Sequence, residues 1–72
     1  MNGRPVKHSL TLHGHRTSVS LEEPFWRAFC HLAEQEGKPI NGLAAEIDTA
    51  REGETGLASA IRLYVLAAAL RR

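Results

Sequence analysis

The chain has 72 residues, of which 43% are hydrophobic, and its formal net charge is only +1. These totals exclude more than one domain and argue against wholesale disorder, and the single cysteine excludes a disulfide within the chain. Because so short a chain buries little surface, we expect it to dimerise. Its longest apolar segment, residues 57–70, is shorter than the roughly 20 residues that span a bilayer. With no signal-peptide pattern in view, we expect a cytoplasmic protein that does not cross a membrane.

The charges are unevenly distributed along the chain. Residues 1–21 contain three basic residues and no acidic one, whereas residues 22–56 hold all eight carboxylates. Residues 57–72 again contain three basic residues and no acid. A symmetric dimer that joined its N-terminal segments would therefore double a local positive charge, although the total is close to neutral.

The N-terminal third of the chain favours an arm and a β-structure. Residues 1–6 are expected to form a flexible arm, because Gly3 and Pro5 interrupt regular structure. Over residues 7–21, apolar and polar side chains alternate on both sides of Gly14, which is typical of strands. The pattern fits one strand bulged at Gly14 or two strands that turn there, so whether residues 7–13 form a separate strand stays open.

Three helices are predicted after the strands, over residues 22–36, 41–50 and 56–70. Apolar residues recur at helical spacing in the first two, and a glycine ends the first. We expect N-caps at Ser20, Asn41 and Thr55. The third helix is apolar on nearly all sides, so a partner subunit is expected to cover one of them.

Polar side chains occupy every second position of residues 16–21, at Arg16, Ser18 and Ser20. The residues between them are apolar or β-branched. If two copies of this strand pair antiparallel across a twofold axis, the apolar set packs on the helices of both subunits and the polar set faces outward. A two-stranded ribbon fits the major groove of B-DNA, where arginine can bond to guanine and serine to several base edges.

These features together resemble a known family. The alternating strand, the acidic and proline-bearing helix start and the turn EGKPINGLAAEI make residues 15–50 similar to the ribbon-helix-helix family of DNA-binding proteins, the Arc and MetJ repressor type. The resemblance implies a mainly α fold with a short β-ribbon, formed by an intertwined homodimer. The extra N-terminal strand and the additional C-terminal helix resemble an extended bacterial variant, with the domain over residues 7–72.

The family pattern also implies roles for particular residues. Carried onto this sequence, it makes Arg16, Ser18 and Ser20 the base contacts. Backbone N–H groups at the start of the second helix would hold a phosphate, as helix N-termini readily do, and lysine and arginine side chains would add charge. The implied phosphate contacts are Arg4, Lys7, Lys38, Ile40, Asn41 and Gly42.

Other chemistries have less support in the sequence. In a strand, His13 and His15 would share a face, so a dimer could gather four imidazoles. The only cysteine, Cys30, lies in the apolar stripe of a helix, however, and surface histidines are the simpler reading. Whether the histidines bind a metal stays open, and neither a metal nor a cofactor is expected. The chain shows no paired carboxylates, glycine-rich phosphate loop or Ser-His-Asp set, so we do not expect an enzyme.

The sequence therefore predicts a homodimer that binds duplex DNA sequence-specifically, as a transcriptional repressor or regulator. The alternative is a dimeric protein-interaction module, antitoxin-like or a partner-binding adaptor, with weak or no DNA binding. The near-neutral charge favours this alternative. The operator, the effector and any higher oligomer are not encoded in a recognisable pattern.

Overall fold

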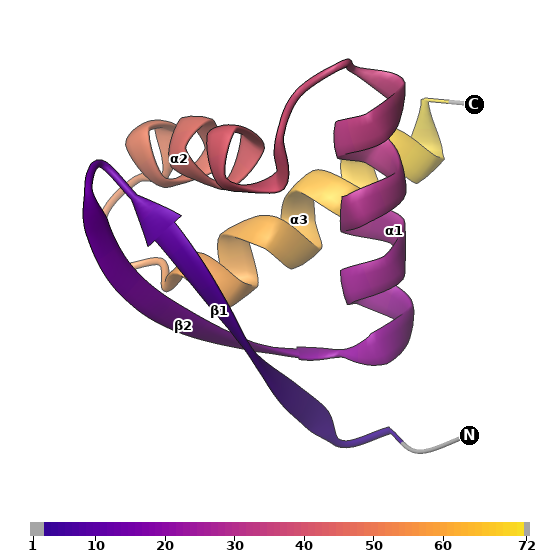
Figure 1. The fold of residues 1–72 in the computed structure, drawn as a ribbon. Coiled ribbons are helices and arrows are strands. Elements are labelled where there is room, and N and C mark those ends of the chain that lie inside the picture. Colours follow the sequence, from indigo (N-terminus) through magenta and orange to yellow (C-terminus); the bar gives the residue numbers. More distant parts are fainter. Residues whose placement is uncertain (1–2, 72) are drawn as a thin grey trace.

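The computed structural model describes residues 3–71, and this part of the chain forms a β-hairpin followed by three helices (Figure 1). The elements are β1 (Pro5–Leu12), β2 (His15–Glu22), α1 (Glu23–Gln35), α2 (Ile40–Ala50) and α3 (Leu57–Leu70). The hairpin runs along one side of the helices, with its turn beside α2 and its open end at the start of α1. The predicted mainly α fold with a short β-ribbon and an additional C-terminal helix is confirmed. Within the described residues, no helix combines the length and apolar character needed to cross a membrane.

The N-terminal segment forms two strands that turn at Gly14, which decides the question that the sequence left open. β1 and β2 are antiparallel neighbours, and Leu12 lies opposite His15 across a two-residue turn. The turn residues His13 and Gly14 have φ angles of 51° and 80°. Positive φ at both central positions is what a type I′ hairpin turn requires, and its twist matches that of the strands.

The flexible arm predicted over residues 1–6 is wrong at its C-terminal end. Pro5 and Val6 belong to β1, where they lie opposite Glu22 and Leu21. Proline is tolerated there because it stands at the first position of the strand. The first two residues of the predicted arm lie outside the described part of the chain.

The core is built from all five elements of the single chain. Leu10 and Leu12 of β1 and Val19 and Leu21 of β2 are buried against the helices, which contribute Phe29, Ala33, Leu43, Ala44, Ile47, Ala60 and Ile61. The alternation along each strand therefore places one face on the helices and the other in solvent. Thr17, expected to pack with the buried set, is exposed near the turn.

Two contacts between distant segments fasten the hairpin to the helices. Arg62 of α3 donates to both carboxylate oxygens of Glu22, from Nε at 2.9 Å and from Nη2 at 3.2 Å. On β1, the ring of His8 stacks on Trp26 with centroids 3.9 Å apart, and its Nε2 lies 3.1 Å from Oε1 of Glu23. At the open end of the hairpin, β1 and β2 are therefore each held to the helices by side chains that the sequence does not predict to interact.

The first helix does not begin with the predicted cap at Ser20. Ser20 is a residue of β2, opposite Lys7, and the N-cap of α1 is Glu22. The strand extends farther than expected because its pairing with β1 continues to Glu22. No side-chain hydrogen bond caps α1, and Pro24 stands in its first turn, where a missing N–H costs little.

The other two predicted caps are also wrong. The N-caps are Pro39 for α2 and Gly56 for α3, and neither helix has a side-chain cap bond. Asn41 lies inside the first turn of α2, and its Oδ1 instead accepts a hydrogen bond from the backbone N–H of Thr11. A tertiary contact has replaced the local one. The helices themselves lie within one residue of their predicted ranges at each end.

Candidate nucleic-acid interface

The outward side of the hairpin carries six polar side chains, which we call the polar ribbon face. They form three cross-strand pairs, Thr11 with Arg16, Ser9 with Ser18, and Lys7 with Ser20. Residues directly opposite each other in an antiparallel pair point to the same side of the sheet. All six are exposed, while Leu10 and Val19 on the other side are buried.

The side chains of the polar ribbon face have no partners among the described residues. Within residues 3–71, none of its six side chains makes a hydrogen bond or an ion pair. The six residues of the face include two positive charges, at Lys7 and Arg16; the next pair on this side of the hairpin, Pro5 with Glu22, adds one carboxylate, which Arg62 binds. Four residue steps separate the pairs of Lys7 and Arg16 along the strands, or roughly 13 Å at about 3.3 Å per residue. The face is thus a cationic, hydroxyl-bearing strip long enough to cover about four base pairs at roughly 3.4 Å each.

The strand edges are as important as the faces. Thr11 donates its N–H to Asn41, so this N–H points away from β2. Hydrogen-bonded and non-hydrogen-bonded pairs alternate in antiparallel strands, so Ser9–Ser18 and Lys7–Ser20 are also pairs whose backbone groups point outward. On the outer edge of β2, the carbonyl of Ser20 lies 3.5 Å from Nη2 of Arg62, a long contact. The edge of β2 is therefore open at Ser18 and partly covered at Ser20.

The start of α2 is the predicted phosphate-binding group. It begins at Ile40, and the first-turn N–H groups of Ile40, Asn41 and Gly42 lie at the positive end of the helix dipole. A Cβ added at Gly42 would stand 3.1 Å from Cγ of Pro39, so glycine allows this proline to close over the helix start. The bond from Thr11 to Asn41 brings this helix start to the outer edge of β1. Sequence-predicted base and phosphate contacts thus lie side by side.

Lys38, the predicted helper of that helix start, is paired with carboxylates. Its Nζ lies 2.9 Å from Oε1 of Glu46 and 3.3 Å from Oε1 of Glu36. These two partners, Glu46 first, raise the pKa of Lys38. Glu36 also accepts a hydrogen bond from the hydroxyl of Tyr64, which with Lys38 lowers the pKa of Glu36. Contact between Lys38 and a phosphate would therefore require exchange of these partners.

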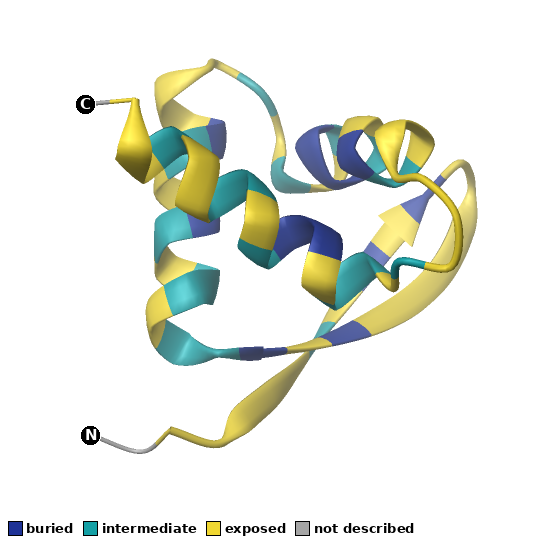
Figure 2. Cartoon of the chain, turned by 180° about the vertical axis from the view of Figure 1, so that it is seen from behind, coloured by how far each residue is buried: buried dark blue, intermediate teal, exposed yellow. Residues whose placement is uncertain are grey.

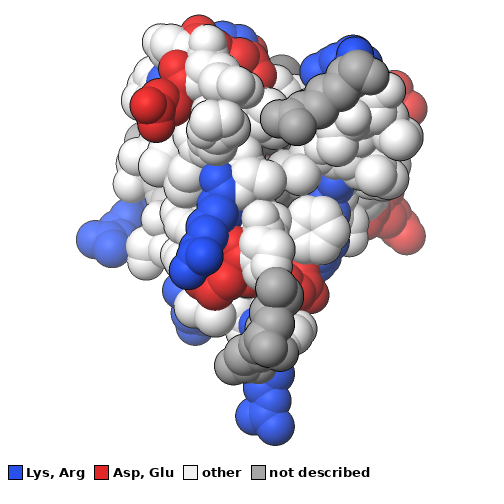
Figure 3. All heavy atoms as spheres, turned by 90° about the vertical axis from the view of Figure 1, so that its right-hand side faces the viewer, with Lys and Arg blue, Asp and Glu red and all other residues white. Residues whose placement is uncertain are grey.

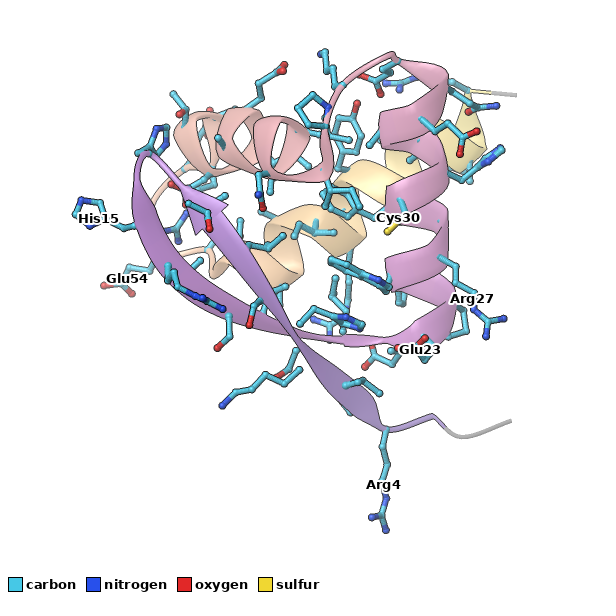
Figure 4. All side chains as sticks on the ribbon, viewed as in Figure 1. Arg4, His15, Glu23, Arg27, Cys30 and Glu54 are labelled. Atoms are coloured by element: carbon cyan, nitrogen blue, oxygen red, sulfur yellow. The ribbon has the colours of Figure 1, made fainter. Side chains whose placement is uncertain are left out.

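The remaining predicted phosphate contacts are on β1 and its approach. Figure 4 shows Arg4 extending from the N-terminal end of β1 away from the helices, and Lys7 is part of the polar ribbon face. The side of the molecule on which α1 lies is different in character, because basic and acidic side chains are interspersed there (Figure 3). The polar ribbon face, in contrast to the α1 side, combines basic and hydroxyl side chains with no acidic residue among its six members.

The histidines do not form the shared strand face considered above. His13 lies in the turn, where its Nε2 is 3.8 Å from Oδ2 of Asp48, and His15 begins β2 and points into solvent (Figure 4). Cys30 is half-buried on α1, and burial raises the pKa of its thiol. In the described part of the chain, no group of three or more His, Cys, Asp or Glu residues is arranged to hold a metal ion.

A comparison with protein families places this arrangement. The family model described as ribbon-helix-helix domain matches residues 5–69. The chain belongs to the ribbon-helix-helix family. The match runs from the start of β1 into the last turn of α3, so both extra elements lie within the matched region. No curated protein and no solved structure matched the chain.

Membership in the ribbon-helix-helix family indicates the general class of protein to which the chain belongs. The family is a non-enzymatic fold of DNA-binding regulators that generally dimerise. The sequence predicts three of the six side chains on the polar ribbon face as base contacts and Lys7 as a phosphate contact. Ser9 and Thr11, the other two residues of this face, are not among the predicted contacts. The alternation of residues 7–12 was the available signal, but only the pairing register shows that these hydroxyls flank Ser18 and Arg16.

Proposed function

We propose that this ribbon-helix-helix protein is a cytoplasmic, sequence-specific regulator of transcription that inserts its polar ribbon face into the major groove of duplex DNA. The observation that carries the proposal is the polar ribbon face itself, a strip of exposed hydroxyls and two cations without internal partners. These exposed side chains have no hydrogen-bond partners within residues 3–71 of the chain, so they are available to an external partner. The edges of DNA bases offer the hydrogen-bond acceptors and donors that such side chains can bind.

The residues of the site divide into two roles. Arg16 can bond to a guanine through two N–H groups, while Ser18 and Ser20 offer single hydroxyls that discriminate less between bases. Phosphates would be held by the N–H groups at the start of α2 and by Arg4 and Lys7, with Lys38 joining only if it leaves its carboxylates. Because phosphate contacts release counterions, affinity is expected to fall as salt rises.

We further propose that the protein acts as a homodimer and that the outer side of α3 joins two copies. Leu63, Leu66 and Leu70 are 59%, 50% and 76% exposed, and Ala67 between them is exposed as well. Their spacing is that of the a and d positions of a coiled coil, which pack against an identical stripe. Figure 2 shows this side of α3, where exposed segments alternate with half-buried ones along the helix. A second copy is the matching occupant, because the stripe is uncharged and complementary to itself.

The ribbon has two candidate second strands. In the intertwined dimer predicted from the sequence, β2 of one copy pairs with β2 of its twin. That pairing stays a prediction, and it would have to use the outer edge of β2, since β1 takes the other edge along the whole strand. In the other arrangement, β1 and β2 of one chain form the complete ribbon.

Selection from a random duplex library with the purified protein tests the proposed function. An enriched motif is expected, and Arg16→Ala should then lose roughly 5- to 150-fold in affinity for it, the equivalent of about 1–3 kcal/mol. Arg27→Ala is the matched control, because Arg27 is an exposed arginine on α1 that points away from the hairpin (Figure 4). Equal binding by the parent and Arg16→Ala would refute the base-contact role of Arg16.

A second candidate function is a protein-interaction module, antitoxin-like or an adaptor. The exposed leucine stripe of α3 favours it, because the same side chains could hold a different protein. Retention on immobilised calf-thymus DNA at low salt separates the two candidates. Delayed elution that disappears at high salt supports the DNA-binding regulator, and elution without delay supports the interaction module.

A further inference from the structure

We infer that Glu46 competes with DNA phosphate for Lys38, so that duplex binding exchanges the Lys38–Glu46 ion pair for a contact between Lys38 and a phosphate at the start of α2. The inference rests on the proposed function and deepens it. It assigns two alternative anionic partners to Lys38, and it makes Glu46 a residue that lowers the affinity for duplex DNA without contacting the DNA.

The first support is the position of the Lys38 ammonium. Lys38 lies directly before Pro39, the N-cap of α2, but its Nζ is 2.9 Å from Oε1 of Glu46, a residue well inside the helix. Glu46 is six residues beyond Ile40, or about 9 Å along the helix axis at about 1.5 Å per residue. The lysine side chain therefore extends along α2, whereas a phosphate bound to the first-turn N–H groups would lie off the end of the helix.

The second support is the balance of charge around Lys38. Its Nζ also lies 3.3 Å from Oε1 of Glu36, so one ammonium faces two carboxylates. In this arrangement Lys38 adds no net positive charge to the helix start, and Glu46 would repel an approaching phosphate. Exchange of one carboxylate for a phosphate keeps Lys38 paired with two anions and brings its charge to the DNA.

The third support is that the two carboxylates are held differently. Glu36 also accepts a hydrogen bond from the hydroxyl of Tyr64, and its side chain is 32% exposed. Glu46 is 57% exposed, and within residues 3–71 its side chain has no hydrogen-bond or ion-pair partner other than Lys38. Exposed ion pairs are weak and are screened by salt, so a phosphate can replace Glu46 at little cost. Glu36 is therefore the partner that stays, and Glu46 is the partner that leaves.

The test measures binding of the full chain to a fluorescent duplex of mixed sequence over a range of salt concentrations. Glu46→Gln keeps the size of the side chain and removes its charge. We expect this variant to bind about two- to fivefold more tightly at low salt, a gain that disappears as salt rises. Lys38→Gln should bind more weakly than the parent. The slope of its log affinity against log salt should be smaller by about 0.9, the value of one phosphate contact.

The combination of both substitutions separates competition from simple repulsion. Without Lys38 there is no ammonium to release, so Glu46→Gln should raise the affinity of Lys38→Gln much less than it raises that of the parent. Glu34→Gln is the matched control, because Glu34 is an exposed glutamate of α1 that makes no ion pair within residues 3–71. It shows how much of the gain comes from the change in total charge alone.

The outcomes separate this inference from the function on which it rests. Equal gains from Glu46→Gln in the parent and in Lys38→Gln would show that Glu46 acts only through its charge, and the inference is then overturned. A loss of affinity in Glu46→Gln overturns it too, because Glu46 would then hold Lys38 in its binding position. In both cases the proposed function stands, since the parent still binds the duplex. A parent that binds no duplex at any salt concentration removes both.

Discussion

The backbone N–H of Thr11 donates a 3.0 Å hydrogen bond to Oδ1 of Asn41, and this bond ties the outer edge of β1 to the first turn of α2. The residues are 30 positions apart in the chain. The bond satisfies a strand-edge donor that has no neighbouring strand, and it sets the distance between the polar ribbon face and the helix start. The predicted base contacts and the predicted phosphate contacts therefore lie at one corner of the fold, joined by this bond.

Asn41→Asp should separate the structural and the binding roles of this corner. The carboxylate keeps the acceptor for Thr11 and suits the positive end of the helix dipole, so thermal stability is expected to stay equal or to rise. The added negative charge would repel a phosphate at the helix start, so DNA affinity is expected to fall by about tenfold at low salt. Gln35→Glu makes the same charge change on α1 and serves as control. Unchanged DNA binding by Asn41→Asp would show that no phosphate lies at the start of α2.

A cross-strand disulfide tests whether the ribbon forms within one chain. In a Cys30→Ala background, Ser9→Cys with Ser18→Cys places two thiols on a non-hydrogen-bonded pair, whose Cα separation of about 4.5 Å lies within the disulfide range. Oxidation is expected to give a bridge within the monomer on non-reducing electrophoresis. Ser18→Cys alone is expected to stay uncrosslinked. Efficient dimer formation by Ser18→Cys alone would instead indicate two β2 strands paired near this residue.

The Glu22–Arg62 pair predicts a definite pH dependence of stability. The hydrogen bonds from Arg62 hold the pKa of Glu22 below its usual 4.5. A lowered folded-state pKa stabilises the protein above the unfolded-state pKa, and this stabilisation is lost as pH falls through the folded-state value. Arg62→Met, which keeps the aliphatic stem near Phe25, should therefore be less stable than the parent at neutral pH. The difference should shrink as pH falls below about 4.

Denaturant titrations of the parent, Arg62→Met and the control Arg27→Met at several pH values provide the measurement. Arg27 is exposed on α1, so its variant should follow the parent at every pH. A stability difference for Arg62→Met that stays constant from neutral to acid pH would show that packing, and not the ion pair, is what Arg62 contributes.

The leucine stripe of α3 predicts the oligomeric state. Leu66→Glu places a charge in the middle of the stripe and is expected to convert a dimer into monomers in sedimentation experiments, with little change in helix content. Ala69 is exposed on the same helix at the edge of the stripe, about 60° around the axis from Leu66, 100° from Leu70 and 120° from Leu63, so the Ala69→Glu variant should weaken the dimer much less than Leu66→Glu. A parent protein that sediments as a monomer at all concentrations would remove the basis for this interface.

Local patterns predicted the elements of this fold well. The three helices lie within one residue of their expected bounds, because their amphipathic spacing and breaking glycines are strong short-range signals. The turn at His13 and Gly14 was undecided, since histidine is not the residue that usually marks a left-handed turn position. Because β2 pairs with β1 along its whole length, the strand continues beyond Ser20, the residue that the capping pattern predicts as the helix N-cap.

Long-range partners are what the sequence did not predict. The contact of Asn41 with Thr11 and that of Arg62 with Glu22 join residues 30 and 40 positions apart, and no local pattern encodes them. The same holds for Lys38. The sequence predicts it as a phosphate contact, but in the structure it forms ion pairs with Glu36 and Glu46. The residues of the polar ribbon face on β2 were predictable from alternation alone, whereas those on β1 needed the register.

A hairpin made from two different strands lacks any symmetry of its own. Lys7 stands near one end of the polar ribbon face and Arg16 near the other, on opposite strands and opposite different hydroxyl residues. A ribbon built from identical strands presents the same chemistry in either direction and so matches inverted repeats. The hairpin of one chain has no such symmetry, so an inverted repeat in the selected DNA would indicate two copies paired about a twofold axis, and a motif with a direction would indicate one hairpin acting alone.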